Sequence, residues 1–161
     1  MRRQILLVVG AMAILASTAW FALAAVTWHS GPTITFNSDH TCVTVTGDGS
    51  GFGNQPAVAH VTANGTVTYT CQNKGGNQSP GQNPVAASST GSQDLGNADH
   101  NGRGVLNLTV CLTALPTVSG DVAGCPNGNW TGINPQPFPV PITGGKVTIT
   151  QGNNTIFTQP F

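Results

Sequence analysis

Hydrophobic and polar residues follow two distinct patterns along this chain. Residues 5–26 are almost entirely apolar, whereas beyond residue 26 short segments rich in valine and threonine are separated by turns of glycine and asparagine. Alternating apolar and polar positions are typical of β-strands, and many short strands between turns are typical of a sandwich or barrel. Signals for helices are nearly absent after residue 26. The predicted strands are 33–36, 42–46, 57–63, 66–72, 85–93, 104–113, 129–133, 146–150 and 155–158.

The sequence around Asn64-Gly65 predicts a β-hairpin. Asparagine followed by glycine supplies the positive φ angles of a two-residue turn, and strand-like sequence lies on both sides of it. In the second strand Val67, Tyr69 and Cys71 share one face, which we expect to be buried. The buried face of the first strand stays open, because its alanines are small.

Two stretches do not fit strands. Residues 74–84 are rich in glycine, asparagine, glutamine and proline, and residues 134–141 carry a proline at every second position. Because proline has no N–H to donate to a sheet, we expect both stretches to be long loops.

The apolar run near the N-terminus predicts export. Arg2 and Arg3 precede it, and residues 22–24 read Ala-Leu-Ala, which is typical of a signal-peptidase site. We therefore expect residues 1–24 to be a signal peptide. The run is also nearly long enough to span a bilayer, so residues 5–26 are the alternative, an uncleaved membrane anchor. In both cases the positive-inside rule places the rest of the chain outside the cell.

Composition limits what the exported part can do. Residues 25–161 are enough for one domain, and charged residues make up only 6% of the whole chain. The basic residues show no cluster, which argues against a nucleic-acid partner. Low charge removes the repulsion that keeps molecules apart, so a homo-oligomer is a plausible partner.

The four cysteines of an exported chain predict two disulfides, with three possible connectivities. We favour Cys71 with Cys125, which lie near loops, and Cys42 with Cys111, which lie in strands and would cross-link sheets. Each bridge is expected to stabilise the fold by about 4 kcal/mol in the chain-entropy model. A zinc site is disfavoured because no Cys-x-x-Cys spacing occurs.

Trp130 lies close to Cys125 in the sequence and could pack on its disulfide, as the core tryptophan of immunoglobulin domains does. The alternative is an exposed stacking residue. We therefore expect an all-β, immunoglobulin-like two-sheet sandwich with long loops, preceded by an N-terminal signal helix.

Residues 51–55 (GFGNQ), 70–73 (TCQN), 75–84 (GGNQSPGQNP) and 125–131 (CPNGNWT) together resemble a group of small secreted, disulfide-containing all-β proteins from Gram-positive and related soil bacteria. The resemblance implies cysteines at the positions of Cys71 and Cys125 and supports their pairing. It also implies a strand after the tryptophan, from which the proline-rich residues 134–141 depart. It implies no particular activity.

Catalytic motifs are missing from the chain. It has no Gly-x-Ser-x-Gly elbow, no P-loop and no glutamate, and its four histidines are not spaced like metal ligands. We therefore expect a protein that is not an enzyme, with no cofactor and no metal.

Function is expected to reside in the surface instead. The leading hypothesis is a non-catalytic extracellular domain with a structural, adhesive or self-assembling role at the cell surface or matrix. The alternative is a carbohydrate-binding module for cell-wall or extracellular polysaccharide. Its ligand-stacking candidates are Trp130, Phe138, Phe52 and Trp28. The third hypothesis is a protease inhibitor that presents the loop around Lys74.

Overall fold

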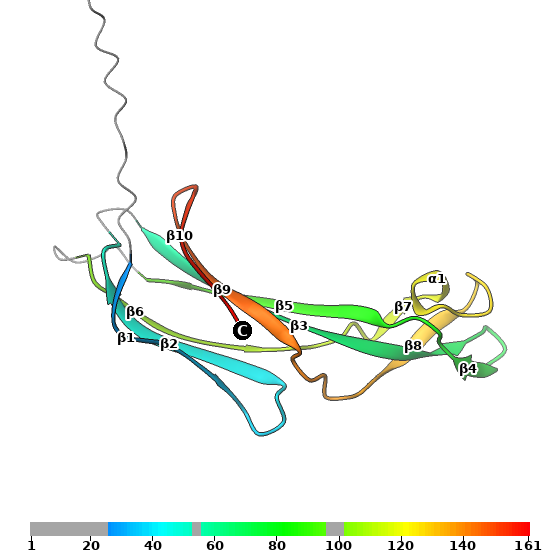
Figure 1. Cartoon of the computed structure of the whole chain (residues 1–161). Coiled ribbons are helices and arrows are strands. Elements are labelled where there is room, and N and C mark those ends of the chain that lie inside the picture. The colour runs from blue at the N-terminus through cyan, green and yellow to red at the C-terminus, as the bar shows by residue number, and fades with distance from the viewer. Residues whose placement is uncertain (1–25, 53–55, 96–101) are drawn as a thin grey trace, which may run out of the picture.

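The computed structural model describes residues 26–52, 56–95 and 102–161. These residues form an all-β fold in two sheets, with one short helix (Figure 1). The elements are β1 (Thr27–Phe36), β2 (Cys42–Ser50), β3 (Ala57–Gln72), β4 (Gln78–Pro80), β5 (Val85–Asp94), β6 (Gly104–Cys111), β7 (Thr117–Ser119), α1 (Gly120–Ala123), β8 (Thr131–Gln136), β9 (Gly144–Gln151) and β10 (Asn154–Pro160). Every predicted strand segment has its counterpart among them.

The predicted hairpin at Asn64-Gly65 is wrong. β3 continues through these two residues, and β5 pairs with it without interruption from Val58 to Val67. The odd-numbered residues of β3 are buried along its whole length, so the inward face does not change at Gly65. The prediction that Val67, Tyr69 and Cys71 are buried is confirmed.

Two layers pack face to face in a sandwich-like arrangement. The smaller sheet has the order β1-β2-β6, and the larger sheet is organised around β3, which pairs with β9 and β5 along its first part. The core between them consists of side chains from both layers, among them Val43, Val45 and Leu106 from the first and Val61 and Ile149 from the second. Alternate residues of each strand thus supply the core, as the period of two requires.

Side chains close one side of the sandwich, where β5 and β6 meet. Gln93 on β5 donates from Nε2 to the carbonyl of Val105 at 3.1 Å and accepts at Oε1 from the N–H of Asn107 at 2.8 Å. Ser89 Oγ accepts from the N–H of Thr113 at 3.2 Å. The amide of Gln93 therefore occupies the place that a neighbouring strand would take beside β6.

Aromatic pairs close the other side. Trp28 on β1 packs edge-on against Phe157 on β10, with ring centroids 5.3 Å apart. Phe36 at the end of β1 packs edge-on against Phe161, with centroids 5.8 Å apart. These contacts join the outer strands of the two sheets without a hydrogen-bond ladder.

Beyond the sandwich, β3 extends into a second group of elements, which we call the extension: β4, β7, α1, β8 and the last residues of β3 (Figure 1). β8 and β4 both pair with β3 between Thr70 and Gln72. The expected loops at 74–84 and 134–141 are therefore partly wrong, since residues 78–80 and 134–136 lie in strands. The prolines of β4 and β8 stand at or next to a strand end, where the missing N–H costs least.

The favoured disulfide connectivity is confirmed. Cys71–Cys125 attaches the segment after α1 to β3, and Cys42–Cys111 joins the paired ends of β2 and β6. The expectation that the second bridge cross-links two sheets is wrong, because β2 and β6 are neighbours in one sheet.

The predicted signal peptide and the alternative anchor lie almost wholly outside the described residues. Within the described ranges, the structure holds no helix of the length and hydrophobicity needed to cross a membrane.

Candidate functional site

The extension exposes a short stretch of backbone on β8. β7 pairs with β8 only from Thr131 to Ile133, so β7 does not reach residues 134–136. An irregular register between β3 and β8 follows Ile133, and Asn134 takes a positive φ of 51°. Such bulges re-aim side chains at the rims of sheets and are common beside binding sites.

A hollow of about 490 Å³ lies beside this stretch, and we call it the Phe138 hollow. None of its lining side chains is charged; they belong to Ala114, Pro116, Asn134, Pro135, Gln136 and Phe138. Phe138 is 75% exposed, and Leu115, between two lining residues in the sequence, is 67% exposed. The hollow combines an exposed aromatic ring with two primary amides, a mixture of apolar area and a few polar groups that is typical of ligand sites.

Tyr69 fixes one wall of the Phe138 hollow. Tyr69 is a buried residue of β3, and its hydroxyl donates to the carbonyl of Leu115 at 2.8 Å. Burial raises the pKa of the Tyr69 hydroxyl, so it keeps its proton and remains a donor. This hydrogen bond and the partly buried Ala114 therefore hold the segment 114–116 against the core, while Leu115 and Pro116 are exposed.

A second hollow of about 340 Å³ meets the first at Gln136. Its lining includes Thr68, Thr70 and Gln78, and Thr68 stands directly opposite Gln136 in the β3–β8 register. Hydroxyl and amide groups thus continue from the Phe138 hollow across the surface of β3 and β4.

The four predicted stacking residues have different environments. Phe138 is exposed as predicted, and Trp130 is half-buried against the core and lines a separate hollow. Phe52 is only 1% exposed, so its assignment as a stacking residue is wrong. Trp28 is partly buried, and its ring packs over Gly47 and edge-on against Phe157. Trp28 lies on β1, whereas Phe52 follows β2 and its ring packs next to Gly104; the sequence offered no reason to separate them from Phe138.

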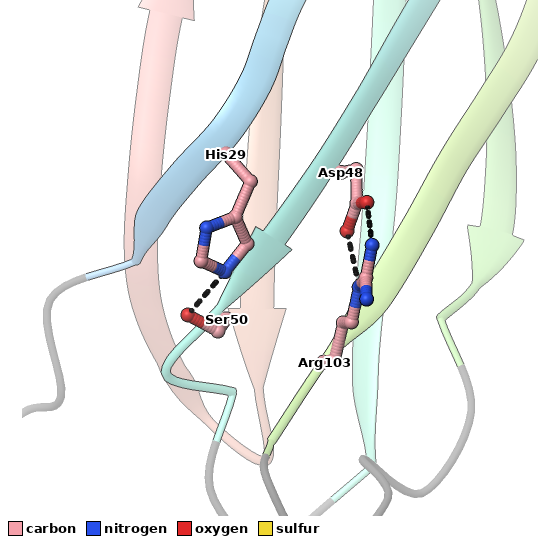
Figure 2. Close-up of polar contacts among 4 residues, drawn as sticks. All are labelled: His29, Asp48, Ser50 and Arg103. Carbon is pink, nitrogen blue, oxygen red and sulfur yellow. Dashed lines mark hydrogen bonds and ion pairs between the residues drawn. The ribbon is translucent and has the colours of Figure 1, made fainter.

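The other end of the molecule carries the ion pair of the described residues. Arg103 donates to both carboxylate oxygens of Asp48, from Nε at 2.9 Å and from Nη2. His29 and Ser50 are hydrogen-bonded nearby, with Nε2 and Oγ 3.0 Å apart (Figure 2). The hydrogen bonds from Arg103 hold the pKa of Asp48 below its usual range, although desolvation opposes the shift. The ion pair links β2 to the residue that precedes β6.

In the described part of the chain, no three histidine, cysteine or acidic residues lie together as metal ligands would. His40 instead stacks on Phe36, with ring centroids 5.2 Å apart, and Asp39 accepts a hydrogen bond from Ser38. Lys74 lies in a tight turn, closed by a hydrogen bond of 3.0 Å from the N–H of Gly76 to the carbonyl of Asn73.

Comparison with protein-family models, curated proteins and solved structures finds no match to this chain. The site is therefore interpreted from its own geometry. Sequence reasoning found Phe138 but missed Leu115, Asn134 and Gln136. The alternate prolines at 135, 137 and 139 were the available signal of this site, because a strand edge with these prolines lacks N–H donors and cannot pair with a further strand.

Proposed function

We propose that this protein is a non-catalytic extracellular domain with a structural or adhesive role, and that it makes contact through the Phe138 hollow. The exposure of Phe138 and Leu115 beside an uncharged hollow carries this proposal. Large apolar side chains gathered on a surface are typical of sites that bind another molecule. The low charge of the chain also leaves little repulsion to oppose association.

A carbohydrate-binding function is the second candidate, and a specific observation favours it. The Phe138 ring lies at a hollow that Asn134 and Gln136 also line. A sugar offers a C–H face that packs on an aromatic ring and hydroxyls that bond to amides, so this combination suits an uncharged glycan. The protease-inhibitor function ranks behind both, because an inhibitor must extend its reactive residue and Lys74 lies in a tight turn.

We propose that residues 1–24 are a signal peptide, with an uncleaved anchor as the alternative, and that the sandwich is immunoglobulin-like. Two disulfides in the described residues are consistent with an oxidising, extracellular location.

The test compares three proteins expressed with their own leader: wild type, Phe138→Ser with Leu115→Ser, and Val105→Ser. Val105 is 61% exposed on β6, away from the extension, and serves as the matched control. Sedimentation velocity measures self-association, and pull-down on chitin, cellulose and peptidoglycan measures glycan binding.

We expect the wild type and Val105→Ser to associate or to bind a glycan. The double variant should lose about tenfold in affinity, because it lacks the two apolar side chains that become buried in the complex. Loss of self-association supports the structural role, and loss of glycan retention supports carbohydrate binding. If micromolar wild-type protein does neither, or if Val105→Ser loses as much as the double variant, the proposal is wrong.

A further inference from the structure

We propose that the hollow lined by Trp130, which is distinct from the two hollows that meet at Gln136, binds a sugar ring that carries a carboxylate, such as a uronic acid of an acidic polysaccharide. This hollow of about 460 Å³ lies between two loops at the tip of the extension, and we call it the Trp130 hollow. Its lining consists of Asn73, Lys74, Gly75, Asn127, Asn129 and Trp130.

The disulfide Cys71–Cys125 brings the two loops together. Cys71 lies near the end of β3, two residues before Asn73, and Cys125 precedes Asn127 by two residues. The bridge therefore holds the starts of the two loops next to one another. The sequence predicted the disulfide that joins these two Asn/Gly loops, and the fold shows that both loops line one hollow.

Hydrogen bonds within each loop orient its asparagine. Asn73 Oδ1 accepts from the N–H groups of Gly75 and Asn77, both at 2.9 Å. Asn127 Oδ1 accepts from the N–H of Asn129 at 3.1 Å. Because both carbonyl oxygens are used inside the loops, the Nδ2 groups are the ends of these amides that remain able to donate to a ligand.

The hollow therefore offers more donors than acceptors. Besides the Nδ2 groups of Asn73 and Asn127, Lys74 brings an ammonium group and Trp130 an indole N–H, neither of which can accept, and the Asn129 amide can both donate and accept. Lys74 forms no ion pair with a described residue, whereas Arg103 is paired with Asp48. An ammonium group beside several neutral donors suits a carboxylate and the hydroxyls around it.

The half-buried indole of Trp130 supplies the apolar part of the site. An indole gives a sugar ring a flat contact area, and this selects a carboxylate carried on a ring over a free anion. The acidic group nearest to the second loop is Asp121, since a Cβ on Gly128 would lie 2.7 Å from its Oδ1. Its negative charge repels an anionic ligand, so removal of this charge provides a second test of the proposal.

The experiment titrates the full chain, purified after expression with its leader, by calorimetry with three probes: oligogalacturonate, a neutral galacto-oligosaccharide and inorganic phosphate. Lys74→Gln removes the ammonium group, and Lys146→Gln on β9 is the matched control. Trp130→Phe keeps a ring but removes the indole N–H, and Asp121→Asn removes the opposing charge.

We expect oligogalacturonate to bind, Lys74→Gln to weaken it about tenfold, and Asp121→Asn to strengthen it, as charge-assisted contacts predict. Lys146→Gln should change nothing, and added salt should weaken binding. Equal binding of the neutral oligosaccharide, full competition by phosphate, an equal effect of Lys146→Gln, or no binding at all would overturn the proposal. Phe138→Ser should leave this affinity unchanged, so failure of the Phe138 hollow and failure of the Trp130 hollow are distinguishable.

Discussion

Gly65 lies in the middle of β3, where the sandwich passes into the extension. Its φ lies outside the left-handed region, unlike that of a hairpin turn residue. A Cβ at this position would lie 2.5 Å from the carbonyl oxygen of Pro141 and 2.6 Å from Leu112 Cδ2. Glycine is therefore required for a close approach of two chain segments, and the turn that the dipeptide predicts is absent.

We expect Gly65→Val to lower the free energy of unfolding by about 1–3 kcal/mol, because the added carbons overpack against a backbone carbonyl. Urea denaturation measures the change. Thr66→Val is the matched control, since Thr66 is exposed on the opposite face of the same strand and should change stability by less than about 0.5 kcal/mol. A wild-type midpoint for Gly65→Val would show that residue 65 has room for a side chain.

At the scale of the elements, the edges of the sheets are closed by side chains. An unpaired strand edge invites pairing with another chain, and proteins protect such edges in several ways. Here the Gln93 amide covers part of β6, and two aromatic pairs join β1 to the C-terminal segment. Contact through side chains at the Phe138 hollow is thus easier to build than addition of a strand at these covered edges.

Gln93→Leu is expected to lower the free energy of unfolding by about 1–2 kcal/mol, since two hydrogen bonds to the backbone of β6 are lost. It should also speed hydrogen exchange at the amide of Asn107, which NMR can measure. Gln82→Leu is the control, because that side chain bonds only the nearby carbonyl of Pro80. Equal effects of the two substitutions, or unchanged exchange at Asn107, would contradict the role of Gln93.

At the scale of the whole molecule, the two disulfides stabilise different parts of the fold. Cys42–Cys111 joins strands that already pair from Cys42 to Gly49, so the sheet holds them without the bridge. Cys71–Cys125 joins β3 to the segment after the four-residue helix α1, which is not part of a sheet and is otherwise held by hydrogen bonds from Gln82 and Asn83 to residues 121–124. The geometry of the Trp130 hollow therefore depends on the second bridge.

We expect each pair of Cys→Ala substitutions to lower the free energy of unfolding by about 4 kcal/mol, because the closed loops are of similar length. Hydrogen exchange with mass spectrometry should then separate them. Loss of Cys71–Cys125 should deprotect residues 120–130, whereas loss of Cys42–Cys111 should leave β2 and β6 protected. Protection of residues 120–130 without their bridge would show that other contacts hold the tip of the extension.

Local pattern was enough to predict much of this molecule. Alternation with a period of two identified the strands, and the apolar or small residues at every odd position through Ala63, Gly65 and Val67 could have shown that β3 is continuous. The sequence nevertheless predicted a turn, because the Asn-Gly dipeptide is a strong local turn signal, whereas a continuous strand becomes evident only over many residues. For the candidate site, Phe138 and Trp130 could be selected from the sequence because they are aromatic. The neighbours that complete their hollows could not be selected in this way.

The sequence by itself determined the all-β class, the positions of the strands, the buried face of residues 67–71 and the low charge of the surface, because each depends on neighbouring residues or on composition. Tertiary structure alone decided which aromatic rings are exposed and where β3 leaves the sandwich. Those properties depend on pairings between residues far apart in the chain, such as Val67 with Val85 and Thr68 with Gln136. No local pattern encodes such pairings, since many partners satisfy the same alternation.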